Sequence, residues 1–113
     1  MKASGSRRAV RMGDQIMREI GTLLVEEAAD PRLNLVTLSG VRMNANLRIA
    51  EIFYTVSGDA EHRKEVQAGL EKATGFLRSR LGRILKLQYT PELRFQFDEF
   101  LEDVVYGKSN STD

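Results

Sequence analysis

Five cations lie close together in residues 72–86 (KATGFLRSRLGRILK), and no acidic residue follows them until Glu92. They are Lys72, Arg78, Arg80, Arg83 and Lys86. Guanidinium groups bind phosphate oxygens through paired donors, and ammonium groups bind them as compact charges. On a helix, Arg80, Arg83 and Lys86 project away from the apolar positions. Arg78 lies at the border of the apolar face. Such a surface is chemically suited to the phosphates of a structured RNA backbone.

A second basic group belongs to the helix predicted over residues 7–29, which carries four arginines: Arg7, Arg8, Arg11 and Arg18. Three of them, Arg7, Arg11 and Arg18, form a narrow stripe opposite the apolar face. The first three arginines lie at the positive end of the helix dipole, whereas Glu26 and Glu27 lie at its negative end. Each such placement costs ~0.3–1 kcal/mol at low salt, so helix stability does not explain these charges.

The ordinary alternative for a basic helix is a solvated polar face. The distribution of charge argues against it, although the net charge is only +1. Residues 72–91 contain no acidic residue, and residues 19–30 contain no basic one. The basic helix also lacks acidic partners three or four positions away that would neutralise it. We therefore favour an anionic partner.

The apolar pattern predicts the elements that position these charges. Strands are predicted over residues 35–44, 48–56 and 92–99, with a bulge at Gly40 in the first. Asp59 is a predicted N-cap for a second helical region. Its apolar positions, among them Leu77, Leu81 and Ile84, keep one helical phase through Ala73-Thr74-Gly75. This region is therefore a bent helix or two helices that meet at a tight joint.

The element order α-β-β-α-α-β predicts a two-layer α+β sandwich, in which the helices cover one face of a three-stranded sheet. A chain of 113 residues predicts one domain, here residues 7–100, with disordered tails over 1–6 and 101–113. No cysteine, signal peptide or apolar run of ~20 residues is present, so a cytoplasmic monomer without membrane contact is expected. The lone His62 and the carboxylates from Asp98 onward predict neither a metal site nor a catalytic site.

The same order is that of a type II KH domain, and the chain resembles the bacterial ribosome-binding factor A family. The resemblance covers residues 7–100 and rests on DPRL (30–33), VTLSGV (36–41), ATGFLRSRLG (73–82) and PELRF (91–95). In ordinary KH domains a GxxG loop between two helices clamps the nucleic acid. This family has a kinked Ala-x-Gly joint instead, which Ala73-Thr74-Gly75 matches.

The resemblance implies a factor without catalytic activity or cofactor that binds the small (30S) ribosomal subunit through 16S rRNA, with ribosomal proteins as further contacts. It implies a role in late subunit maturation and 16S rRNA 5′-end processing, including in the cold, alongside ribosome-associated GTPases. The predicted RNA-binding residues are the nine cations named above. One alternative stays open, a protein–protein adaptor on the KH scaffold without direct RNA contact. It would dock through the acidic C-terminal end or through the outer sheet face, which Ile49 and Phe53 would share.

Overall fold

The computed structural model of the chain describes residues 3–100, with side chains from residue 7 onward. Its elements follow the order α1 (Ala3–Glu26), the 3-10 helix η1 (Pro31–Leu35), β1 (Thr37–Met43), β2 (Ile49–Thr55), α2 (Ala60–Leu85) and β3 (Glu92–Phe97). Of the two predicted tails, residues 1–2 and 101–113 lie outside the described residues. Residues 3–6 form the first turn of α1, because extending a packed helix adds one hydrogen bond for each residue that it orders.

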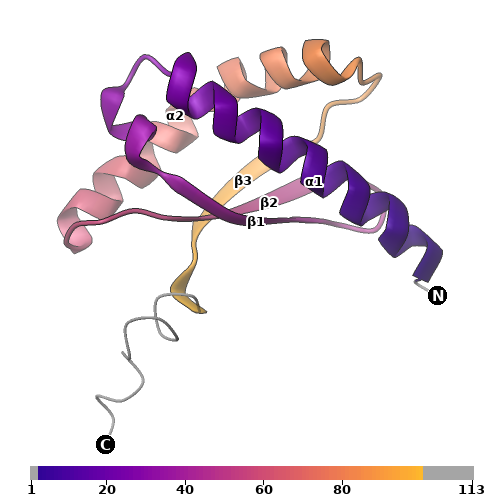
Figure 1. The fold of residues 1–113 in the computed structure, drawn as a ribbon, viewed down its shortest axis with the longest axis horizontal. Coiled ribbons are helices and arrows are strands. Elements are labelled where there is room, and N and C mark those ends of the chain that lie inside the picture. Colours follow the sequence, from indigo (N-terminus) through magenta and orange to yellow (C-terminus); the bar gives the residue numbers. More distant parts are fainter. Residues whose placement is uncertain (1–2, 101–113) are drawn as a thin grey trace, which may run out of the picture.

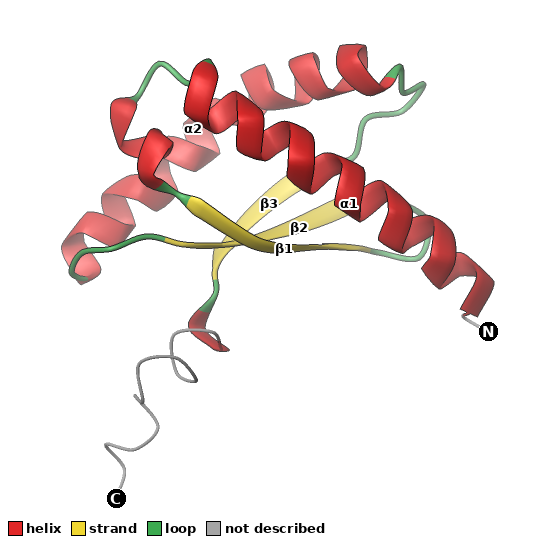
Figure 2. Ribbon diagram, viewed as in Figure 1, coloured by secondary structure: helices red, strands yellow, loops and turns green. Residues whose placement is uncertain are grey.

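The three strands form one sheet in the order β1-β2-β3. β1 pairs antiparallel with β2, and β3 pairs parallel with β2. The register shifts between Leu38 and Gly40, which confirms the predicted bulge. Figure 1 shows both long helices on the same side of the sheet, and Figure 2 separates the helical layer from the strand layer. The predicted α+β class and its two layers are therefore confirmed.

α1 ends three residues earlier than predicted, at Glu26 rather than residue 29. The Asp30-Pro31 pair that predicted this end instead begins η1. The Asp30 carboxylate accepts a hydrogen bond from the backbone N–H of Arg32 at 3.0 Å, which is an N-cap, and proline is suited to the first position of a helix. The Asp30-Pro31 pair therefore marks the start of η1, whereas the sequence analysis interpreted it as the end of the preceding helix.

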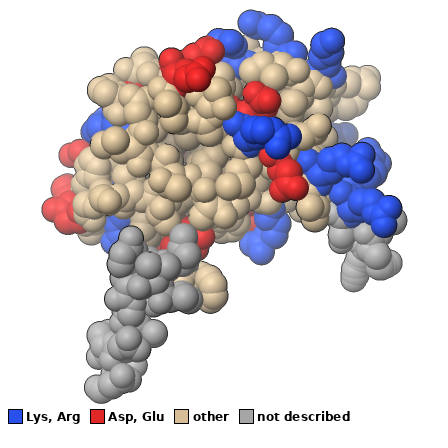
Figure 3. Space-filling model, in the orientation of Figure 1, with Lys and Arg blue, Asp and Glu red and all other residues tan. Residues whose placement is uncertain are grey.

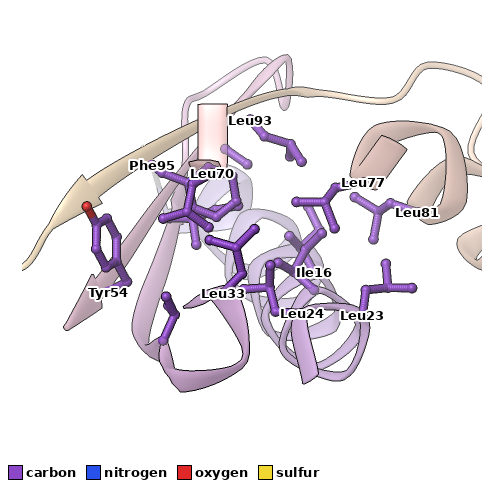
Figure 4. Packing of buried hydrophobic residues seen from close by; sticks show 14 of the residues in the cluster. Ile16, Leu23, Leu24, Leu33, Tyr54, Leu70, Leu77, Leu81, Leu93 and Phe95 are labelled. Carbon is purple, nitrogen blue, oxygen red and sulfur yellow. The ribbon is translucent and has the colours of Figure 1, made fainter. Parts of the chain in front are cut away.

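The core lies between the helices and the sheet (Figure 4). Ile16 of α1, Leu77 of α2 and Ile52 of β2 are completely buried. Burying one such side chain contributes about 1.5–3 kcal/mol. Of the two residues after Leu81 that were expected to face the core, Leu85 packs against it, whereas Ile84 is 40% exposed and that expectation is wrong. Positions three and four residues beyond Leu81 both lie near its helix face, so the spacing alone placed both toward the core.

α2 runs without interruption through the predicted joint, and its axis bends. Figure 1 shows its ribbon changing direction between the pink N-terminal part and the orange C-terminal part. At the joint, the Thr74 hydroxyl donates a hydrogen bond to the Glu71 carbonyl at 2.8 Å, a back-bond of the kind that bends helices. Asp59 caps the start of α2, as predicted, by accepting the His62 N–H at 2.9 Å.

Candidate nucleic-acid interface

Three predicted arginines of α1 surround one hollow. Arg7, Arg8 and Arg11 are exposed and line a cavity of about 260 Å³ together with Met12 and Leu47. Leu47 belongs to the turn between β1 and β2, so this wall of the hollow comes from a different part of the sequence. Three guanidinium groups around one concave surface form a geometry suited to a phosphate group.

The turn that supplies Leu47 is held by side-chain hydrogen bonds. The Asn44 carboxamide oxygen accepts the backbone N–H groups of Arg48 at 2.9 Å and Ile49 at 3.0 Å. The Asn46 carboxamide oxygen accepts the same Arg48 N–H at 3.1 Å. These bonds fix the backbone that carries Leu47 beside α1.

The fourth predicted arginine of α1, Arg18, is also exposed, but a carboxylate shares its side of the helix. At 100° per residue, Asp14 falls in the same stripe as Arg11 and Arg18, four positions before the latter. Figure 3 accordingly shows acidic atoms among the basic ones along α1. The N-terminal end of α1 is therefore its most strongly basic part.

Two of the predicted cations of α2 are occupied within the protein. Arg78 donates from Nε to the Pro91 carbonyl at 2.9 Å and from Nη2 to the Thr90 carbonyl at 2.8 Å, which ties α2 to the segment that leads into β3. The guanidinium of Arg80 forms an ion pair with both carboxylate oxygens of Glu27, which follows α1. The interpretation of Arg80 as an uncompensated charge was wrong, because its partner lies 53 residues away in the sequence.

The other three cations of this group, Lys72, Arg83 and Lys86, are exposed. Within the described part of the chain, no hydrogen bond or ion pair engages their charged groups. They share one side of α2, since Lys72 and Arg83 are separated by 11 positions, which is about 20° in azimuth. These cations can therefore approach one extended polyanion together.

Phe76 lies on this same side of α2, four positions after Lys72. Its side chain is 39% exposed, which is unusual for a large apolar residue within a helix that covers a sheet. The sequence analysis missed it, although it stands outside the apolar stripe of Leu70, Leu77 and Leu81. The sequence did offer one indication of it, because Phe76 is an aromatic residue outside the apolar stripe that lies between Lys72 and Arg83 on one helix face.

Within residues 7–100, seven of the nine predicted RNA-binding residues thus form no hydrogen bond or ion pair through their charged groups. We call them the basic surface: Arg7, Arg8, Arg11, Arg18, Lys72, Arg83 and Lys86. Figure 3 shows two separate groups of basic side chains, one over the N-terminal half of α1 and one along the edge above the C-terminal part of α2, with acidic atoms among those over α1. Charges of one sign gathered in this way attract an oppositely charged polymer.

Comparison with known proteins identifies the family. Residues 8–108 match the family model described as ribosome-binding factor A. The chain belongs to the ribosome-binding factor A family. A ribosome-binding factor A from Halothermothrix orenii is 41% identical over 95 residues, which cover 84% of this chain and 78% of that protein.

Two structures of this family share the fold. The solution NMR structure of a Thermotoga maritima protein described as a putative ribosome binding factor A matches with a TM-score of 0.69 and 31% identity, over 79% of this chain and 85% of that one. A homology model of the Thermus thermophilus ribosome binding factor A, fitted into the cryo-EM map of a 30S complex, matches with a TM-score of 0.64 and 22% identity. That match covers 77% of this chain and 91% of the other, and it shows the fold alone.

In this member of the ribosome-binding factor A family, polar side chains cover the sheet face opposite the helices. Arg42 forms an ion pair with Glu51 at 3.1 Å, and its guanidinium lies 5.4 Å from the ring centre of Phe53. Phe53 and Ile49 are both half-buried. Among the described residues, Arg42 and Glu51 therefore place charged groups beside Phe53, one of the two apolar side chains that the adaptor alternative invokes.

Among residues 3–100, no three His, Cys, Asp or Glu side chains come together in a group that could hold a metal ion. Asp98, from the predicted C-terminal run of carboxylates, accepts a hydrogen bond from the Ser39 hydroxyl at 2.6 Å. In the same part of the chain, no helix is long and apolar enough to cross a bilayer.

Proposed function

We propose that this protein binds the small ribosomal subunit through 16S rRNA. Two observations carry the proposal. Three exposed cations on one side of α2 pair with no residue of the described part of the chain, namely Lys72, Arg83 and Lys86, and three arginines of α1 line one hollow. The proposal's support from the family comes from relatives named ribosome-binding factor A, one of which has been fitted into the map of a 30S complex.

The ion pair between Arg80 and Glu27 has a role in this function. It holds the C-terminal part of α2 against the end of α1, so that the two basic groups keep a constant separation. Arg78 adds a second tie, from α2 to the start of β3. A surface that is rigid before binding loses less conformational entropy when it docks on structured RNA.

The same binding event serves the biological role that we propose. The protein assists late maturation of the subunit and processing of the 5′ end of 16S rRNA, including during growth in the cold. It acts as a cytoplasmic monomer without cofactor or catalysis of its own, alongside ribosome-associated GTPases that perform the remodelling. Ribosomal proteins next to the rRNA site provide further contacts.

Binding should depend strongly on salt. Each phosphate contact releases counterions and contributes about −0.7 to −0.9 to the slope of log Kobs against log salt concentration. If all seven cations of the basic surface contact phosphates, the slope is therefore about −5 to −6. RNA duplexes expose mainly phosphates and 2′-hydroxyls, so this surface recognises shape more than base sequence.

The test is cosedimentation with free small subunits at several salt concentrations. Neutralising Arg83→Gln and Lys86→Gln together should weaken binding and make the slope shallower by about 1.4–1.8, which is about 0.7–0.9 for each lost contact. Lys64→Gln is the matched control, because Lys64 is exposed on the N-terminal part of α2 and does not belong to the basic surface. Binding of the double variant with wild-type affinity and slope would refute the proposed interface.

A further inference from the structure

A second, larger cavity lies beside the bend of α2. It has a volume of about 490 Å³ and opens between the segment that joins α1 to η1 and the middle of α2. Leu33, Ala73 and Phe76 supply apolar wall. At Gly69, a Cβ atom would come within 3.1 Å of the Asp30 carboxylate and 3.3 Å of Leu33, so η1 approaches α2 closely at this side of the cavity.

The two carboxylates that line this cavity are already neutralised. Glu27 forms the ion pair with Arg80. Asp30 binds Arg32, whose Nη2 lies 2.8 Å and whose Nε lies 3.1 Å from the carboxylate oxygens. These hydrogen bonds from Arg32 hold the pKa of Asp30 below its ordinary value, so the group stays ionised and paired. The acidic residues therefore do not make the cavity a site for a cation.

Lys72 is the remaining charged residue of the lining. Its ammonium is exposed, and no hydrogen bond or ion pair in residues 7–100 engages it. The charge of Lys72 acts, after the hydrogen bonds from Arg32, to lower the pKa of Asp30, so its ammonium lies near a carboxylate that Arg32 already binds. The cavity thus combines an apolar wall, an aromatic ring that is 39% exposed and one cation that no hydrogen bond or ion pair of the described residues engages. A ligand that complements these features has a flat apolar part joined to an anionic group.

We propose that this cavity binds one unpaired nucleotide of the RNA, with its base stacked on Phe76 and its phosphate on Lys72. The inference rests on the proposed function and adds a single-stranded element to a surface otherwise suited to duplex phosphates. Bases that are splayed out of RNA structure stack on aromatic side chains. The volume lies within the range of about 300–1,000 Å³ that is typical of small-ligand sites. Arg83 and Lys86, on the same side of α2, take neighbouring phosphates.

An apolar side chain of a ribosomal protein is the competing occupant. It would fill the apolar part of the cavity, but it would offer Lys72 no acceptor beyond the Asp30 carboxylate, which Arg32 already binds. Removing a charge from water without a partner is costly. The nucleotide avoids that cost, since its phosphate pairs with the ammonium.

Replacing Phe76 tests the stacking. Phe76→Leu keeps an apolar side chain without an aromatic face, so affinity for free small subunits should fall at least about 5-fold, while the salt slope stays that of wild type. Phe76→Trp should restore the affinity. Tyr89→Leu is the control, because Tyr89 is an exposed aromatic residue, at 66%, outside the cavity, and its loss should leave binding unchanged.

The Phe76→Trp variant also reports the occupant directly, because the chain contains no other tryptophan. A stacked base should quench its fluorescence when small subunits are added. Binding without quenching would mean that no base stacks on this ring and would overturn the inference. The inference would also be overturned if Phe76→Leu bound with wild-type affinity. If the double variant Arg83→Gln with Lys86→Gln still weakened binding in the same experiments, the proposed function would stand. If wild type itself shows no salt-dependent binding, the proposed function fails as well.

Discussion

Replacing Gly75 by alanine should make the protein more stable, and the structure allows the gain to be estimated. Gly75 is exposed within α2, and the one described glycine with a positive φ is Gly58. A Cβ atom added at Gly75 would meet nothing within 4 Å, so it neither clashes nor gains packing. What remains is helix propensity, which favours alanine by about 1 kcal/mol because glycine loses more backbone freedom on folding.

A gain of about 1 kcal/mol in the free energy of unfolding corresponds to a rise in Tm of about 4–8 °C for a domain of this size. Urea denaturation followed by far-ultraviolet circular dichroism measures it. The midpoint should rise, and the m-value should stay constant because the surface exposed on unfolding does not change. Affinity for the small subunit should be unchanged, since we attribute the bend to the Thr74 back-bond.

Gly82→Ala is the matched control in the same helix. There the new Cβ atom would lie 2.5 Å from the Thr90 hydroxyl oxygen, so the clash should cancel the gain in propensity. If Gly75→Ala and Gly82→Ala stabilised the protein equally, the space around the added Cβ atom would not determine the change in the free energy of unfolding. A Gly75→Ala variant no more stable than wild type would refute the reasoning, and it would mean that the bend of α2 requires glycine at this position.

Two further predictions concern the carboxylates next to the basic surface. Glu27→Gln should lower the free energy of unfolding by about 0.2–1 kcal/mol, as expected for a half-exposed ion pair. Urea denaturation measures this loss, and an unchanged free energy of unfolding would contradict the assignment of Arg80 as paired. The pKa of Asp30 is lowered by the hydrogen bonds from Arg32, so its contribution to stability is present above about pH 4 and is lost as the pH falls. In Asp30→Asn, the free energy of unfolding should therefore fall less steeply as the pH is lowered below about 4. An unchanged pH dependence would contradict a stabilising contact between Asp30 and Arg32.

Most of the secondary structure could be predicted because its signals are local. The strands were placed within two residues of their observed bounds, since alternation of apolar residues and turn chemistry act over short segments. The Asp59 cap depends on a side chain three residues from its partner. The start of α1 and the role of Asp30-Pro31 were less well predicted, because a helix start and a helix stop can use the same residue types.

The candidate site was predicted in part. Lys72, Arg83 and Lys86 were assigned to the surface, and the structure leaves them exposed. Arg78 was assigned to RNA, and the structure shows it bound to backbone carbonyls. Phe76 was missed, because the spacing that excludes it from the apolar stripe does not reveal the cavity that it lines.

The linear chain is enough to establish how many cations each helix carries and which helix face is apolar, because both follow from residue type and spacing along one element. Whether a given cation is free or paired is settled by folding. Glu27 reaches Arg80 because the end of α1 packs beside the C-terminal part of α2, and no pattern within either helix encodes that contact. Charge pairing acts through space and falls steeply with distance in salt, so the surface left for RNA depends on which segments the core brings together.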